Sequence, residues 1–118
     1  MRVLITTSGP DRESQPSEPD AEGMEAIGRF HEELAAAGVL LAAGQLYPTS
    51  KAARVRFDGA ARTVIDGPFT EAKEYIAGYW LWQVRSLDEA VEWLKRAPFQ
   101  GGEFEIRQVV DQPVPGAG

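Results

Sequence analysis

His31 is the only histidine in the 118-residue chain, and its side chain is the one best suited to acid–base chemistry. An imidazole gains and loses a proton near neutral pH, so it can serve as a general acid or base. Asp66 begins a turn and is a candidate to orient that ring or to hold a ligand. The two would form a catalytic pair only if the fold places them in contact. The structural alternatives are a half-buried helix histidine with a hydrogen-bonded ring and a turn aspartate that accepts hydrogen bonds from backbone amides.

Four further residues are candidates for ligand binding, namely Lys73, Tyr79, Trp82 and Arg107. Lys73 lies between acidic neighbours, so it could hold an anionic ligand or pair with a nearby carboxylate. Arg107 could bind a carboxylate through two parallel hydrogen bonds if its side of the last strand faces another sheet, and it would be solvated otherwise. Tyr79 and Trp82 offer aromatic surfaces for a ligand, although such rings more often belong to a core or an interface.

Several kinds of site are excluded or poorly supported by the composition. The chain has no cysteine, which excludes disulfides, thiolate metal sites and a cysteine nucleophile. One histidine with scattered carboxylates lacks the spacing of a metal site. Gly101-Gly102 is typical of a turn, not of a phosphate-binding loop. We therefore predict no metal and no cofactor.

The charge and hydropathy of the chain limit its partners and location. The net charge of −6, from 12 Lys and Arg against 18 Asp and Glu, disfavours direct binding to nucleic acid. No apolar run approaches the length needed to cross a bilayer, and the apolar start breaks at Ser8-Gly9-Pro10, too early for a signal-peptide core. We therefore expect a cytoplasmic protein without membrane contact.

The candidate residues must be positioned by elements that the apolar spacing predicts. These are strands at 2–7, 39–46, 76–84 and 103–110, helices at 21–37 and from 87 onward, and a hairpin of 54–57 with 62–65. A bulge is expected at Gly44, a left-handed cap at Gly38, and a short helical turn at 70–74. Ser86 caps the second helix and Pro98 ends it.

This order of elements predicts an α+β fold of the ferredoxin-like, split βαβ kind. Both helices should cover one face of an antiparallel sheet. The length fits a single domain at 1–112, followed by a flexible tail at 113–118.

The segment 76–84 is the most strand-like in the chain, and both of its faces are apolar. One face carries Trp80, Trp82 and Val84, and the other carries Tyr79, Leu81 and Gln83. Helices can cover only one of these faces, so the other would expose large side chains of the kind that mark an interface or a ligand groove. We therefore predict a homodimer in which two sheets pack face to face. The alternative is a monomer with aromatic rings at the sheet rim.

The stretch 66–74, which begins Asp66-Gly67-Pro68-Phe69, together with Ile76-Ala77-Gly78-Tyr79-Trp80, resembles the hallmark of the DGPF proteins within the YCII-related family. Segments 31–34, 37–40, 86–90 and 105–107 agree with the family in order and spacing. The resemblance runs from the first strand to about residue 110. It implies a dimeric α+β barrel made of two ferredoxin-like sheets.

The resemblance also carries implications for function. The wider family includes a dehydrochlorinase of a chlorinated aromatic compound, associated with a histidine–aspartate pair, and His31 resembles the family's histidine position. Many DGPF proteins are encoded beside, or fused to, sigma factors of the extracytoplasmic-function type, which implies a functional link to a sigma factor. One position departs from the family. YCII proteins often read Asp-Pro-Phe after the second helix, whereas this chain reads Ala97-Pro98-Phe99, so chemistry that needs that carboxylate is in question.

Two functions are compatible with these features. The first is a homodimeric module that binds a small molecule or a protein partner in a regulatory setting, favoured by the apolar sheet and the scarcity of acid–base groups. The second is a small lyase, dehydrochlorinase-like or hydrolase enzyme that uses His31 and Asp66 on a small aromatic or carbonyl compound. The first is the preferred hypothesis, and contact between His31 and Asp66 at a cleft would favour the second.

Overall fold

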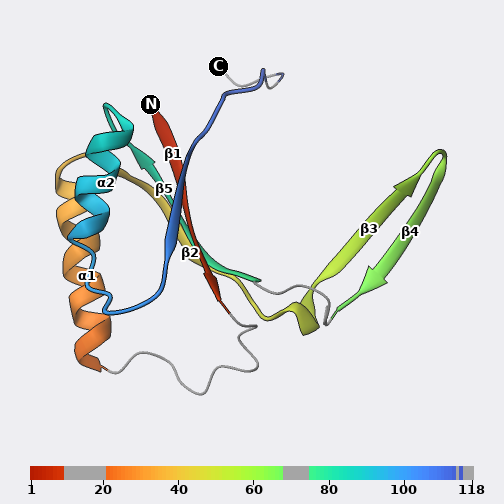
Figure 1. Ribbon diagram of the computed structural model, residues 1–118, viewed down its shortest axis with the longest axis horizontal. Coiled ribbons are helices and arrows are strands. Elements are labelled where there is room, and N and C mark those ends of the chain that lie inside the picture. Colours follow the sequence, from red (N-terminus) through yellow and green to blue (C-terminus); the bar gives the residue numbers. More distant parts are fainter. Residues whose placement is uncertain (10–20, 68–74, 114, 116–118) are drawn as a thin grey trace.

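The computed structural model describes residues 1–9, 21–67, 75–113 and 115, and within these ranges the fold is α+β (Figure 1). The main sheet has the spatial order β2-β5-β1-β6, and all its pairs are antiparallel. Its strands are β1 (Arg2–Gly9), β2 (Leu40–Gln45), β5 (Tyr75–Gln83) and β6 (Phe104–Gln108). The helices α1 (Ala21–Ala36) and α2 (Leu87–Lys95) follow β1 and β5. This is the split βαβ arrangement predicted from the sequence.

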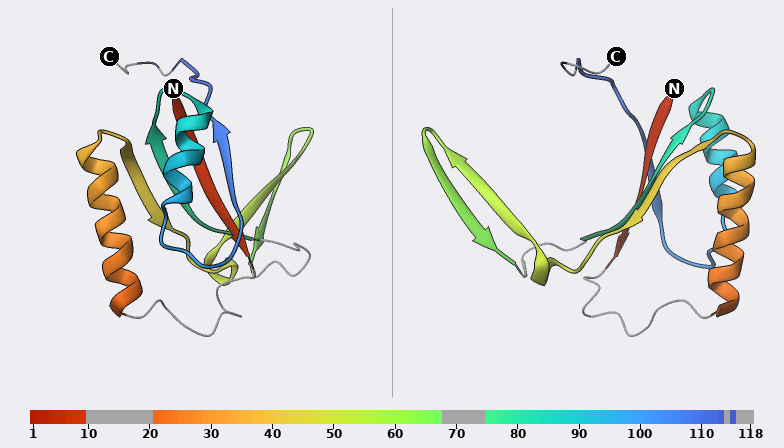
Figure 2. Two further views of the ribbon diagram at one scale, coloured as in Figure 1. Left: turned by 60° about the vertical axis from the view of Figure 1, so that its left-hand side comes forward. Right: turned by 180° about the vertical axis from the view of Figure 1, so that it is seen from behind.

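A second sheet is formed by the hairpin of β3 (Ala53–Asp58) and β4 (Ala61–Asp66). A short 3₁₀ helix, η2 (Thr49–Lys51), precedes it. The predicted turn at Asp58-Gly59 is confirmed, with Gly59 at φ 59° in the left-handed region that glycine adopts without steric cost. Both helices lie on one side of the main sheet and the hairpin projects on the other side (Figure 2).

Local signals in the sequence set the helix ends. Gly38 has φ 73° after α1, and the following Val39 N–H donates to the Leu34 carbonyl at 2.9 Å, which satisfies an otherwise unpaired helix carbonyl. At the start of α2 the Ser86 hydroxyl accepts from the Glu89 N–H at 3.1 Å, as predicted. The Glu89 carboxylate reaches back to the Arg85 N–H, one residue earlier than in a standard capping box.

The hydrophobic core lies between the main sheet and the two helices. Its buried members are Val3, Ile5, Phe30, Leu34, Val39, Trp80, Trp82, Val84 and Ala90. The Phe30 ring packs edge-on against both indoles, with ring centroids 5.7 Å from Trp80 and 6.2 Å from Trp82. The tryptophan side of β5 is therefore the one that the helices cover.

The predicted bulge at Gly44 was wrong, because the register of β2 against β5 shifts between Leu40 and Ala42 instead. Gly44 stays in register opposite Tyr79, and a Cβ there would lie 2.6 Å from the tyrosine ring. A glycine within a strand marks either a bulge or a close approach, and here it permits the close approach. The bulge leaves Leu41 49% exposed.

No helix in the described part of the chain is both long enough and apolar enough to cross a membrane.

Candidate functional site

The residues predicted to carry function divide between the two sides of β5. Trp82 is 0% exposed, and its indole stacks on that of Trp80 with centroids 5.3 Å apart. It is a core residue in this chain, and its Nε1 has no hydrogen-bond partner among the described residues. Tyr79, which lies three residues before Trp82 on β5, is 37% exposed on the opposite face. A ligand can reach Tyr79 directly, whereas it can reach Trp82 only by opening the core.

His31 lies on the helix side of the sheet and is hydrogen-bonded to Trp80. The Trp80 indole Nε1–H donates to His31 Nε2 at 2.9 Å, and the two rings meet edge to face with centroids 5.9 Å apart. An indole nitrogen can only donate, so Nε2 must carry the lone pair and the proton of the neutral ring must be on Nδ1. His31 is half-buried. His31 is thus a half-buried helix histidine with a hydrogen-bonded ring, which is the structural alternative to a catalytic role. Its Nδ1 is the ring atom that can contact another group.

Two phenyl rings pack against the other parts of the Trp80 indole. Phe104 stacks on Trp80 with centroids 6.0 Å apart, Phe99 also lies 6.0 Å from Trp80, and the two phenyl rings are 5.1 Å from each other. Phe99 follows α2 and Phe104 begins β6. Phe99 and Phe104 therefore pack against the same indole that is hydrogen-bonded to His31.

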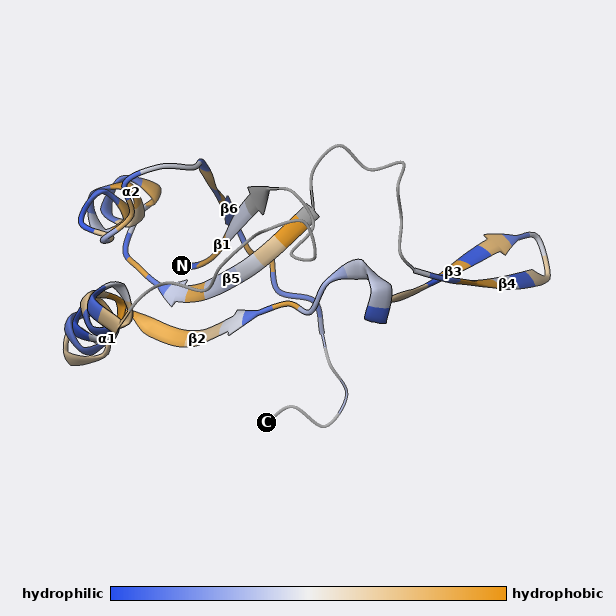
Figure 3. Ribbon diagram, turned by 90° about the horizontal axis from the view of Figure 1, so that it is seen from below, coloured by the Kyte–Doolittle hydropathy of each residue, from blue (hydrophilic) through white to orange (hydrophobic). Residues whose placement is uncertain are grey.

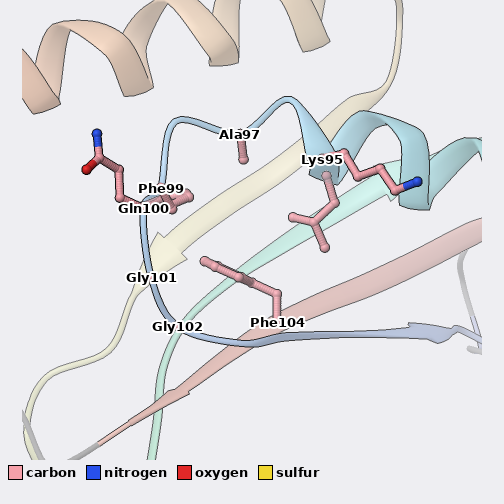
Figure 4. Close-up of a pocket in the computed structure, with 8 residues that line it drawn as sticks. Lys95, Ala97, Phe99, Gln100, Gly101, Gly102 and Phe104 are labelled. Carbon is pink, nitrogen blue, oxygen red and sulfur yellow. The ribbon is translucent and has the colours of Figure 1, made fainter.

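An open hollow of 330 Å³ lies over these phenyl rings, between the end of α2 and the start of β6 (Figure 4). Leu94, Ala97, Phe99 and Phe104 supply its apolar lining. The side chains of Lys95 and Gln100 point away from the rings (Figure 4). The Lys95 ammonium instead pairs with the Glu92 carboxylate at 3.2 Å. The exposed lining of the hollow is mostly polar, with the two phenyl rings, the Ala97 methyl group and Leu94 as its apolar part. No signal in the sequence indicated the hollow beyond Pro98-Phe99 and Gly101-Gly102.

Neither α1 nor α2, the two α-helices of the described residues, lies over the other side of the main sheet (Figures 1 and 2). Leu81 lies opposite Leu4 on the inner strands, and Leu4 lies opposite Arg107 on the edge strand β6. Tyr79 lies in the next row, opposite Thr6. We call this surface, centred on Leu4, Tyr79 and Leu81, the open face. It joins two of the predicted ligand-binding residues, because Tyr79 and Arg107 are both on it.

Arg107 is exposed, and its Nε lies 3.7 Å from the Glu105 carboxylate. Glu105 is the other charged residue of β6 on this side, since Phe104 and Ile106 alternate with the two and pack against the core. The guanidinium therefore lies at the margin of the open face, on the same side of β6 as Glu105. Its use as a carboxylate anchor stays a prediction.

Asp66 ends β4, opposite Ala53, and its side chain is exposed. The backbone hydrogen bond at this turn is made by the neighbouring Gly67, whose N–H donates to the Ala52 carbonyl at 2.8 Å. A Cβ on Gly67 would lie 1.6 Å from the Thr49 carbonyl oxygen, so only glycine fits this crossing. Lys73 and the predicted helical turn at 70–74 lie outside the described residues.

His31 and Asp66 are not brought together within the described chain. The first lies on α1, and the second ends the hairpin on the other side of the main sheet (Figure 2). The single chain therefore adds no support to a catalytic pair, which stays a prediction. The described residues also contain no cluster of three or more histidine, aspartate or glutamate side chains that could hold a metal ion.

Comparison with known proteins places the chain in a family. The model of the YCII-related domain matches residues 1–112. The chain belongs to the YCII-related family. A protein of Rhizobium meliloti (strain 1021), which is described as uncharacterized, is 34% identical to it over 93 residues, covering 76% of this chain and 75% of the relative. Membership of the YCII-related family agrees with the α+β topology and assigns no activity to this YCII-related protein.

Proposed function

We propose that this YCII-related protein is a homodimer that binds a small molecule, built as a dimeric α+β barrel of the DGPF type. The observation that carries the proposal is the open face of the main sheet. Leu4 is 36% exposed and Tyr79 37% exposed in the middle of a sheet whose other side is fully packed. Apolar surface at such a position stabilises association by about 25 cal/mol per Å² when it is removed from water.

The arrangement of the open face suits a second copy of the same face. The apolar residues lie on the inner strands β5 and β1, and the charged pair Glu105–Arg107 lies on the edge strand β6. A carbon-rich centre with a polar rim is the usual anatomy of a protein interface. A two-fold axis through the centre would cover the same residues on both copies at once.

The ligand half of the proposal is supported by the hollow beside Phe99 and Phe104. Its 330 Å³ is at the lower end of the range for small-molecule sites, about 300–1,000 Å³. Ala97 lines it at the position where the family often has an aspartate, so a methyl group stands in place of a carboxylate. The phenyl rings suit an aromatic group, and the polar part of the lining can form hydrogen bonds with a hydroxyl on that group.

The homodimer is tested by changing one central residue of the open face. Leu81→Glu places a carboxylate between two hydrophobic sheets and should convert the dimer into a monomer at micromolar concentration. Gln83→Glu is the matched control, because Gln83 is on the same strand and the same face but already polar and exposed. Light scattering after size exclusion measures the mass of each. A monomeric wild type would rule the proposal out.

The hollow is tested with 2-naphthol as a neutral aromatic probe. Amide resonances of 94–104 should shift on titration, and Ala97→Asp should weaken binding about fivefold or more because the new carboxylate loses water. Gln100→Ala is the control, since that side chain points away from the rings (Figure 4). Shifts spread over the surface, or unchanged affinity in Ala97→Asp, would remove the ligand half of the proposal and leave the homodimer intact.

A further inference from the structure

The β3–β4 hairpin has almost no cover from the rest of the described residues. Every residue from Ala53 to Val64 is exposed, including Val55 at 52%, Phe57 at 68% and Val64 at 65%. An isolated two-stranded hairpin is at best marginally stable in water, because a single ladder buries little apolar surface. The hairpin therefore lacks, within the part of the chain that the structure describes, the packing that such an element needs.

The two sides of the hairpin differ in character. Val55 lies opposite Val64, and Phe57 lies opposite Arg62, so these share one side. Arg56 and Thr63 lie opposite each other on the other side. The alternation is visible as hydrophobic and hydrophilic bands along both strands (Figure 3). Alternation of this kind is the pattern of a strand with one side buried, so the valine side has the composition of a contact surface.

Contacts at both ends of the hairpin hold its shape. At the base, the Gly67 N–H bonds to Ala52 and its Cα lies close against the Thr49 carbonyl. At the tip, the Arg62 guanidinium donates to the Gly59 and Ala61 carbonyls at 2.8 and 2.9 Å. It also lies 4.4 Å from the centroid of the Phe57 ring. These contacts fix the shape of the hairpin and its junction with η2, and we call the hairpin the arm.

The arm extends the molecule on the side of the open face. The radius of gyration is 16.9 Å, whereas a compact chain of this length would have about 13.5 Å. The helices lie on the far side of the main sheet from the arm, as Figure 1 and the right-hand view of Figure 2 show. A second copy that packs on the open face would therefore occupy the side of the sheet toward which the arm projects.

Charge favours a copy of this chain as the partner of the arm. The arm carries Arg54, Arg56 and Arg62 against Asp58 and Asp66, a formal charge of +1. The whole chain carries −6, so the rest of it carries −7. The valine side of the arm carries Arg62 and Asp66, whose charges cancel, so an acidic copy of the chain does not repel it. Arg54 and Arg56 on the other side are attracted to that acidic copy.

We propose that the β3–β4 arm closes over a second copy of this chain and buries its Val55, Phe57 and Val64 side against that copy. The proposal rests on the proposed homodimer and adds to it a second contact outside the two sheets. Because the dimer is symmetric, each copy gives one arm and receives one. The arm then gains the cover that its own chain does not provide.

The first experiment compares two adjacent residues of β4 that face opposite ways. Val64→Lys should raise the dimer dissociation constant about tenfold or more, since two buried valines are lost per dimer. Thr63→Lys adds the same charge one residue away, on the side of the arm opposite the valines. It should change the dimer dissociation constant less than about threefold. Sedimentation equilibrium measures both. Equal dissociation constants for the two variants would overturn the arm contact.

The second experiment does not depend on Val64→Lys keeping the hairpin intact. The chain has no cysteine, so Val55→Cys and Arg56→Cys each provide one thiol, on opposite sides of the arm. In the dimer the thiol at 55 should react with Ellman's reagent at least about tenfold more slowly than the thiol at 56. Adding Leu81→Glu should make the two rates similar.

The outcomes separate the arm from the homodimer. Similar thiol rates in a protein that is still dimeric would overturn the arm contact and leave the sheet-to-sheet dimer in place. A monomeric wild type would overturn both. Slow reaction at position 55 that persists after Leu81→Glu has produced a monomer would mean that the arm is covered by its own chain, which also overturns the proposal.

Discussion

The main sheet and the hairpin are both antiparallel and each has an apolar side that needs cover, yet among the described residues only the main sheet has such a side packed. One side of the main sheet meets α1 and α2, and Val3, Ile5 and Trp82 on that side are at most 1% exposed. Val55 and Val64 of the hairpin have the same kind of side chain and are more than half exposed. The comparison shows that alternation specifies which side of a strand needs cover, whereas the topology decides whether the same chain can supply it.

The largest expected effect is in the packed sheet. Trp82→Ala should lower the free energy of unfolding by about 3–5 kcal/mol, because it removes a fully buried indole and leaves a cavity beneath Phe30. Trp82→Phe should cost less than about 1.5 kcal/mol, since it keeps most of the volume and removes an indole N–H without a partner among the described residues. Urea denaturation at one fixed protein concentration measures both. A large loss in Trp82→Phe would mean that the N–H has a partner after all.

A smaller effect is expected where the two sheets join. Gly67→Ala should destabilise by about 1–3 kcal/mol, because its Cβ would overlap the Thr49 carbonyl and the backbone must shift. The shift should redirect the arm. The loss in free energy of dimerisation should therefore exceed the loss in free energy of unfolding. Gly28→Ala is the control, since a Cβ at that glycine of α1 meets nothing within 4 Å. A Gly67→Ala protein with the wild-type dimer constant would mean that the direction of the arm is unimportant.

The His31 contact ranks next. His31→Leu leaves the Trp80 N–H without its acceptor at a position where Trp80 is 7% exposed. The expected cost is about 1–2 kcal/mol, with a change in tryptophan fluorescence. Trp80→Phe made in the same protein removes the stranded donor, so the two changes together should cost less than their sum. Additive costs would mean that the hydrogen bond contributes nothing to stability.

Features of the sequence that act locally predicted the structure well. Gly38 ends α1, Ser86 caps α2, and Asp58-Gly59 turns the hairpin, because each conformation depends on residues within a few positions. The two faces of β5 were also predictable, since a strand alternates with a period of two. These signals fixed the fold class and identified Trp82 as a residue of either the core or a site.

The candidate site was less predictable because its parts meet through long-range packing. His31 and Trp80 are 49 positions apart, and neither sequence neighbourhood indicates their hydrogen bond. The hollow forms only because α2 ends beside the start of β6, which depends on how both pack on the sheet. The bulge was placed at Gly44 instead of Leu41 because a strand glycine has two uses, and only the position of the Tyr79 ring distinguishes them.

The smallest expected change in the free energy of unfolding is for a substitution in the arm of a monomeric variant. This test separates the packing of the main sheet from that of the arm most clearly. In the Leu81→Glu background, Val64→Thr should change the free energy of unfolding by less than about 0.5 kcal/mol, because an exposed strand residue has little apolar contact to lose. In the dimer the same change should weaken association, since a hydroxyl then enters a hydrophobic contact. Urea titration of the monomer and sedimentation of the dimer give the two numbers. If Val64→Thr destabilises the monomer as strongly as it weakens the dimer, the arm is packed within its own chain and the contrast between the two sheets disappears. If it affects only the dimer, the same alternation of residues specifies intramolecular packing in one sheet and intermolecular packing in the other.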